Sequence, residues 1–440
     1  MHRKIKYATV LLVAALTLSG CSMRTVDEMY RLPKRSENYN NLQSVIESAM
    51  QGLEYCAPLT GENQQTVQLA DLDGDGVEEY LLFAKGSQDK PLRILIFRNN
   101  EDGFVNIASA ECNGSAFDQV EYIDMDGDGG SEVVVGRQLS DQVIRSVSVY
   151  TMVEDDLIQM TTLNYSKFLT ADLDGDNLSE LFLLHPGETD TDRGVAELYS
   201  MKNGAIERYN EVNMSHPVDK LKRIIFGKLS GGKPAVYTAC AASDTALVTD
   251  VFTLTDGRLV NLTLASETDT NVRTMRNFYI YADDIDNDGV VELPSLISTH
   301  ALDDTEDTDM HHLIRWYAMN PDGTEVDKMY TYHDFVSGWY LQIDSNKANQ
   351  LAVRNLGNQT DFYIWDQEFK SAQKLMSVYA FTGQNREEQG LSEGRFVLYK
   401  TESVVYSGLL DENAGAYDFT QEKVVYNFRL IQKDWKTGET

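Results

Sequence analysis

The chain has 440 residues, and its 69 acidic and 38 basic side chains give a formal charge of −31 at pH 7. Hydrophobic residues make up 42% of the sequence, which is typical of a globular protein and argues against a disordered one. The acidic excess argues against nucleic acid and anionic membrane surfaces as direct partners, because phosphate groups are bound by basic patches.

Residues 1–20 have the pattern of an export signal. Three basic residues within the first six positions precede the apolar run YATVLLVAALTL, which is short for a membrane span. The run ends in the residues LSGC at 18–21, which resemble a bacterial lipobox. That resemblance implies cleavage before Cys21, acylation of Cys21, and a protein held on the outer face of the bacterial cell membrane by lipid alone. An ordinary secretory signal or an uncleaved anchor is the alternative.

A tether and a short helix are expected next. Residues 21–39 are polar and mixed in charge, so they predict a tether. Residues 40–63 form a lead-in to the main domain, and a short amphipathic helix is predicted at its start. The apolar residues recur there at helical spacing, at Leu42, Val45, Ile46 and Met50.

Three cysteines follow Cys21, at positions 56, 112 and 240. An odd number of thiols cannot pair completely, and the spacing favours no particular disulfide. We expect buried free thiols, although one disulfide is compatible with export.

An acidic nine-residue motif then recurs four times, with starts separated by 53, 48 and 112 residues. The copies are DLDGDGVEE at 71–79, DMDGDGGSE at 124–132, DLDGDNLSE at 172–180 and DIDNDGVVE at 284–292. The last interval is two steps of 56, so one copy is missing near residue 228. There, the stretch FGKLSGGKPAVYTA keeps the apolar pattern but replaces the acids with Lys228, Ser230 and Gly232. A repeat of this period is typical of a solenoid, propeller or array.

Each unit reads as four short strands. An apolar run enters the acidic motif, two further strand-like runs follow, and an Asn-Gly or Asp-Gly turn leads to a fourth. Residues 341–353 look like a decayed copy, and residues 395–410 hold two strand-like runs around a polar turn. We therefore predict an all-β protein, a β-propeller of seven four-stranded blades over residues 64–440, with acidic loops in blades 1, 2, 3 and 5. Six blades plus a cap is the alternative.

The acidic motif predicts a calcium loop that is not an EF-hand. Short carboxylates at positions 1, 3 and 5 of a tight loop converge on one cation, and Ca²⁺ prefers six to eight hard oxygen ligands. An EF-hand closes with glutamate at position 12, whereas the acid here is at position 9 and a strand follows the loop. Positions 4 and 6 are Gly or Asn in every copy, which suits a backbone with positive φ curling around an ion.

We expect up to four structural Ca²⁺ ions, bound by the side chains at positions 1, 3, 5 and 9 and by the carbonyl of position 7. These residues are Asp71, Asp73, Asp75, Val77 and Glu79; Asp124, Asp126, Asp128, Gly130 and Glu132; Asp172, Asp174, Asp176, Leu178 and Glu180; and Asp284, Asp286, Asp288, Val290 and Glu292.

In these loops and their strands the chain resembles the FG-GAP or VCBS type of calcium-binding propeller repeat, related to the propeller of integrin α-subunits. The resemblance covers residues 64–440 and is strongest over the four acidic units. It implies a propeller with structural calcium and a partner-binding face opposite the acidic loops. It implies no reaction, because such repeats occur in adhesion, scaffolding and catalytic proteins.

Two classes of function are compatible with this pattern. The first is a surface-anchored binding or scaffold module for a protein or glycan. The second is an exported hydrolase or lyase with its site opposite the acidic loops, where residues 185–194 and 298–312 combine histidines with acids. Solvated acidic loops are the simpler interpretation of both segments. No motif of a nucleophilic or metal-dependent hydrolase is present, so we predict no catalytic residue. Acids, His or Arg converging near the axis would favour the enzyme, and a broad aromatic and polar rim would favour the binding module.

Overall fold

The computed structural model describes residues 37–100, 103–139, 144–187, 193–299, 302, 312–366 and 371–431. The predicted signal peptide, Cys21 and almost all of the tether lie outside these residues. Among the described residues, no helix has both the length and the hydropathy that a membrane crossing requires.

The described chain is mostly β and forms six antiparallel sheets. Sheet 1 contains β1 (Glu54–Tyr55), β2 (Val67–Ala70), β3 (Glu79–Lys85), β4 (Leu92–Asn100) and β5 (Gly103–Cys112). Sheet 2 contains β6 (Ala116–Ile123), β7 (Glu132–Gln138), β8 (Arg145–Val153) and β9 (Asp156–Tyr165). Sheet 3 contains β10 (Lys167–Ala171), β11 (Glu180–His185), β12 (Val195–Lys202) and β13 (Ala205–Asn213). Sheet 4 follows the short helix η1 (Val218–Lys220) and contains β14 (Leu221–Lys228), β15 (Pro234–Ala241), β16 (Leu247–Thr255) and β17 (Arg258–Asn261).

The last two sheets have five strands each. Sheet 5 contains β18 (Glu292–Ser298), β19 (His312–Met319), β20 (Glu325–Asp334), β21 (Trp339–Ile343) and β27 (Phe428–Leu430). Sheet 6 contains β22 (Leu351–Asn355), β23 (Gln359–Asp366), β24 (Ser371–Thr382), β26 (Val404–Leu410) and β25 (Phe396–Lys400). The helices of this half are α4 (Ser345–Ala348), α5 (Arg386–Leu391), η2 (Ala414–Tyr417) and α6 (Gln421–Asn427).

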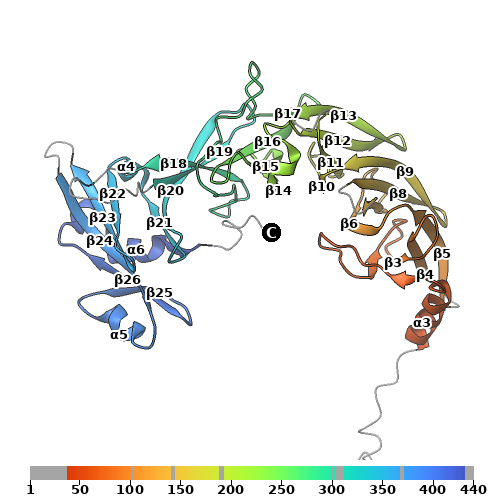
Figure 1. Ribbon diagram of the computed structural model, residues 1–440, viewed down its shortest axis with the longest axis horizontal. Coiled ribbons are helices and arrows are strands. Elements are labelled where there is room, and N and C mark those ends of the chain that lie inside the picture. The colour runs from red at the N-terminus through yellow and green to blue at the C-terminus, as the bar shows by residue number, and fades with distance from the viewer. Residues whose placement is uncertain are drawn as a thin grey trace, which may run out of the picture.

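Neighbouring sheets pack face to face, and the core lies between them. Phe83 of sheet 1 meets Phe117 of sheet 2 edge to face, with ring centroids 5.0 Å apart. Tyr332 of sheet 5 and Phe362 of sheet 6 repeat this contact at 5.2 Å. Figure 1 shows the six sheets following one another along an open arc, with sheets 1 and 6 at its two ends. In sheets 2 to 4 the first strand lies on the concave side of the arc and the last strand on the convex side.

The helix α3 (Glu37–Ala49) covers one face of sheet 1. Its apolar residues Val45, Ile46 and Ala49 pack against buried residues of β3 and β4. The next segment contributes β1, which pairs with β3 at the start of the arc. Residues 52–59 therefore extend sheet 1 through β1. They do not pair with the last sheet, as they would if they closed the blades into a ring.

The prediction of seven blades in one register is wrong for the described residues. Residues 341–353 do not form a hairpin loop, because β21 pairs with β20 in sheet 5 and β22 belongs to sheet 6. In the segment between β21 and β22, the Lys347 ammonium binds the Asp344 carboxylate at 2.7 Å. This ion pair lies where the acidic loops gather three carboxylates. Residues 395–410 form β25 and β26; β26 pairs with β24 on one side and with β25 on the other, which completes sheet 6. A separate seventh sheet is absent from the described part of the chain.

The thiols at positions 56, 112 and 240 are all free, as expected, and two of them are buried. Cys112 lies between sheets 1 and 2, where its Sγ is 3.1 Å from the hydroxyl of Tyr150. Burial raises the pKa of the Cys112 thiol, which keeps it protonated and unreactive.

Candidate metal centre

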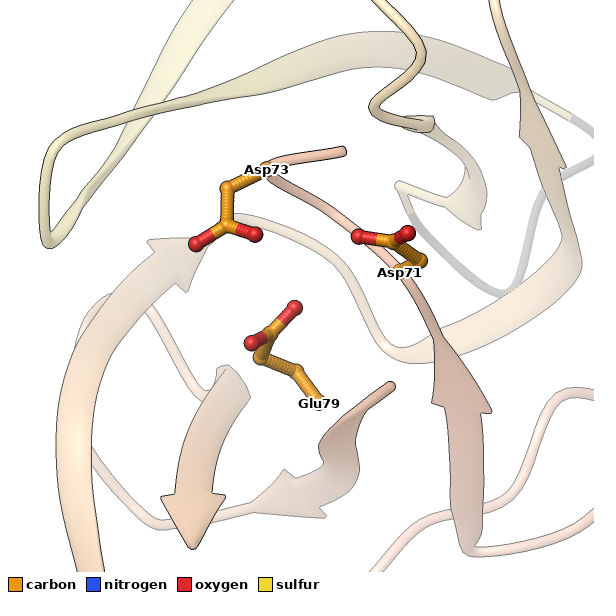
Figure 2. Close-up of side chains that lie close together, drawn as sticks. All are labelled: Asp71, Asp73 and Glu79. Atoms are coloured by element: carbon orange, nitrogen blue, oxygen red, sulfur yellow. The ribbon is translucent and has the colours of Figure 1, made fainter. Parts of the chain in front are cut away.

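Each of the four acidic loops brings three carboxylates together. One oxygen from each side chain at positions 1, 3 and 9 lies within 4.8 Å of the other two. Figure 2 shows the first loop, where the side chains of Asp71, Asp73 and Glu79 surround a shared space. The equivalent triads are Asp124, Asp126 and Glu132; Asp172, Asp174 and Glu180; and Asp284, Asp286 and Glu292.

The first aspartate organises the backbone of its loop. In the first loop Asp71 Oδ1 accepts the N–H of Gly74 at 2.8 Å, and Oδ2 accepts that of Gly76 at 2.9 Å. Both glycines have positive φ, +73° and +83°, which a residue with a Cβ adopts only under strain. The residues at positions 4 and 6 of the other loops share this conformation, which confirms the prediction; they are Gly127, Gly129, Gly175, Asn177, Asn287 and Gly289.

The fifth-position aspartates are not part of the triads. Asp75 Oδ1 accepts the N–H of Val77 at 2.7 Å, and the same bond joins positions 5 and 7 in the other three loops. This bond fixes the turn before the outgoing strand. Coordination by the fifth carboxylate and by the carbonyl of position 7 stays a prediction.

The glutamate at position 9 is buried in every loop, with at most 2% of its surface exposed. Its Oε2 accepts the backbone N–H of position 2, as Glu79 does from Leu72 at 3.0 Å. Burial, followed by the repulsion of the nearby aspartates, raises the pKa of Glu132 and Glu180 to about 7 and that of Glu292 to about 8. A divalent cation relieves this penalty because it supplies opposite charge to the ionised carboxylates.

One buried oxygen in the fourth loop lacks a partner. Glu292 Oε1 accepts no hydrogen bond from any described residue. Lys328 Nζ lies 3.9 Å from it and is bound instead to Asp288. Buried acceptors without partners are rare, and a cation inside the triad would satisfy this one. The donor set consists of hard oxygens, so the residues fit a hard divalent cation such as Ca²⁺.

The four loops differ in what faces the buried glutamate. Extending the β3–β4 register by one residue places Arg98 opposite Glu79, and its Nε donates to Glu79 Oε1 at 2.8 Å. The same guanidinium binds Asp73, and it reaches Asp155 of the neighbouring sheet at 2.9 Å. The first triad thus already holds a side-chain cation.

The second and third loops carry neutral groups at the corresponding place. Thr151 donates its hydroxyl to Glu132 at 3.0 Å, and in sheet 3 the register places Ser200 opposite Glu180. The fourth loop has Ala318 opposite Glu292, but Lys328 from β20 binds Asp288 beside it. Among the described residues, side-chain cations therefore partly neutralise loops 1 and 4 but not loops 2 and 3.

Backbone hydrogen bonds join consecutive loops. Asp71 O accepts the N–H of Ser131 at 2.9 Å, and Asp124 O accepts that of Ser179 at 3.0 Å. In both cases position 1 of one loop is bound to position 8 of the next. Lys228 O accepts the N–H of Val291 at 3.0 Å in the same way, so residue 228 is the structural equivalent of the first aspartate.

This chain of contacts explains a glycine at position 7 of the second loop. A Cβ on Gly130 would lie 2.7 Å from the carbonyl oxygen of Leu72 in the first loop. Neither the backbone hydrogen bonds between loops nor the two side-chain cations, Arg98 and Lys328, were predicted from the sequence. Aligning the third strands of the units would have found Arg98, because Arg98 follows Glu79 by the same 19 residues as Thr151 follows Glu132.

In the first histidine-containing segment, 185–194, the histidine itself is a described residue. His185 Nε2 lies 3.4 Å from Glu197 Oε2, and Arg208 binds the other oxygen of that carboxylate. Burial opposes ionisation of Glu197, but hydrogen bonds from His185, Arg208 and Tyr199 lower its pKa to about 2. This is a structural ion pair. Of the second segment, 298–312, the structure describes residues 298, 299, 302 and 312.

No family model matches the chain, and no curated protein sequence matches it. Among solved structures, a rhamnogalacturonan lyase from Bacillus licheniformis is similar at a TM-score of 0.31 and 12% identity, covering 74% of this chain and 82% of the lyase. The Dos1 propeller is similar at a TM-score of 0.31 and 9% identity, covering 81% of both chains. A putative 6-phosphogluconolactonase from Bacteroides fragilis is similar at 0.28 and 10% identity, covering 73% and 92%. Likeness at these scores supports no conclusion about function.

Proposed function

We propose that the chain is an exported, lipid-anchored binding module of the propeller type, stabilised by calcium and directed at a protein or glycan. The observation that carries the proposal is the equivalence of the four acidic loops. Each holds a carboxylate triad within 4.8 Å at the entry to a sheet. Such repetition is typical of a structural role, because a catalytic site needs one constellation and not four copies.

Calcium would stabilise the fold through two physical effects. It would neutralise the buried glutamate and the two aspartates close to it, and it would fix the start of each outgoing strand. Since the carbonyl of Asp71 accepts a bond from the second loop, a cation in one loop also supports the next sheet. Metal that binds only the folded chain raises stability by mass action.

The membrane attachment is tested on the living cell. Labelling with a fatty-acid analogue should mark the wild-type chain, and Cys21→Ser should abolish both the label and membrane retention. A wild-type chain that carries no lipid would refute this part of the proposal.

The binding role is tested with full-length protein in detergent. It should bind calcium and retain a protein or glycan from the extracytoplasmic fraction, and chelation should reduce both. Absence of calcium binding together with an unchanged melting curve in chelator would overturn the proposal.

A second candidate, an exported hydrolase or lyase, is supported by one cavity. It has a volume of about 590 Å³ and lies along the first strands of sheets 2, 3 and 4. Two glutamates, Glu62 and Glu121, line it together with Lys167, Lys222 and Arg223. Burial raises the pKa of Glu121, as a general acid requires. Chain cleavage of an acidic polysaccharide that is lost in Glu121→Gln would establish this activity, and no turnover by the wild type would exclude it for that substrate.

A further inference from the structure

The outer edges of sheets 5 and 6 border an open groove of about 810 Å³. One wall is the start of the fourth acidic loop, including Asp286 and Asn287. Residues of β20, of β21, of β25 and of the C-terminal segment from α6 to β27 complete its lining. This volume lies within the range of about 300–1,000 Å³ that ligand pockets span.

Three tyrosines line this groove. Tyr426 of α6 is 72% exposed and Tyr399 of β25 is 49% exposed, so neither is needed to fill the core. The Arg429 guanidinium lies 5.7 Å from the Tyr426 ring centroid and donates to the Phe428 carbonyl at 2.7 Å. Tyr340 is held in place by stacking on His333, with ring centroids 5.0 Å apart. Exposed aromatic side chains clustered in a hollow are typical of a recognition surface, since they offer contact area at low entropic cost.

Polar groups alternate with these rings. Gln342 and Asn427 supply amides, Arg429 and Lys328 supply cationic donors, and Asp286 supplies an acceptor. A sugar ring needs this combination, because its apolar C–H face stacks on an aromatic ring while its hydroxyls bind planar amides and charges. The alternative is a peptide that adds a strand, but β27 offers an edge of only three residues.

From these observations we infer that the groove binds an oligosaccharide, with Tyr399 and Tyr426 as stacking platforms. This inference rests on the proposed function, because it names the ligand class and the site of the binding module. Asp286 belongs to the fourth acidic triad and also lines the groove. Calcium in that loop would therefore fix one wall of the sugar site, and glycan binding depends on this loop more than on the second one.

The test uses full-length protein in detergent on an array of defined neutral and uronate-containing oligosaccharides, followed by calorimetry on any that bind. Tyr426→Ala and Tyr399→Ala should each weaken binding by about tenfold or more. Tyr55→Ala is the matched control, because Tyr55 is 58% exposed and lies in sheet 1, outside the groove. Melting curves confirm that each variant is folded.

Two loop variants separate this inference from the proposed function. Asp286→Asn should reduce glycan binding together with calcium binding at the weaker site of the fourth loop, whereas Asp126→Asn should reduce calcium binding at a tight site and leave glycan binding unchanged. Calcium binding without binding of any oligosaccharide overturns the inference and leaves the calcium-stabilised module standing. Glycan binding that survives both tyrosine variants, or a peptide that competes for the same site, also overturns it. Glycan binding at the tyrosines without any bound calcium contradicts the proposed function instead.

Discussion

Replacing Arg98 with methionine should increase the calcium affinity of the first loop. Arg98 binds Asp73 and Glu79, two of the three carboxylates of the triad, and its side chain is only 21% exposed. Before a cation can take these oxygens, the protein must give up charge-assisted hydrogen bonds that contribute about 1.5–3 kcal/mol. Removing the guanidinium therefore raises affinity by roughly 10- to 100-fold, since 1.4 kcal/mol is a factor of ten.

Calorimetric calcium titration of the full-length protein measures this effect. The wild type should show two tight sites, in loops 2 and 3, and Arg98→Met should show three. Arg315→Met is the matched control, because Arg315 binds Glu325 and Asp327, which belong to no acidic loop. Four equal sites in the wild type, or an unchanged titration in Arg98→Met, would refute the role assigned to Arg98.

Three further predictions follow from the contacts described above. Lys328→Met should add a tight calcium site in the fourth loop by the same reasoning, and the same titration measures it, with Lys400→Met as an exposed control. Gly130→Ala should destabilise the fold by roughly 1–3 kcal/mol in urea unfolding, because the added methyl meets Leu72 O, whereas Gly415→Ala meets nothing within 4 Å and should be neutral. The His185–Glu197 pair predicts a pH dependence of the melting temperature. The pKa of Glu197 is lowered to about 2, so its contribution is present above its ordinary value of 4.5 and is lost as pH falls toward 2. The hydrogen bond that His185 donates to Glu197 raises the pKa of His185, so that contribution is complete below 6.5 and is lost at higher pH. The loss of stability in Glu197→Gln should be largest between pH 4.5 and 6.5, where both contributions are present. A loss of the same size at every pH would contradict this reasoning.

The local features of the loops were predictable from the sequence because they depend on residues a few positions apart. Gly74 and Gly76 carry positive φ for the steric reason that the sequence suggests. The repeat spacing also located Lys228. Its backbone carbonyl accepts the hydrogen bond that the carbonyl of the first aspartate accepts in the acidic loops. Periodicity alone places such a position, even where the side-chain chemistry has been lost.

The later part of the arc was not predictable in the same way. The strand before residue 344 matches the repeat, yet β21 pairs with β20 and not with β22, although sheet 4 keeps the corresponding β14–β15 pair without any acids in its loop. Pairing of β27 with β21 joins residues about 90 positions apart, and no local pattern signals it. Arg98 and Lys328 were missed because they lie on strands distant in sequence from the acids they bind.

The most direct test of the central claim is thermal unfolding of the full-length protein in detergent, in millimolar calcium and in excess chelator. Acidic triads that bind calcium only in the folded state predict a melting temperature that rises with the logarithm of calcium concentration. Asp126→Ala should flatten that rise. Superimposable melting curves in calcium and in chelator would contradict the account.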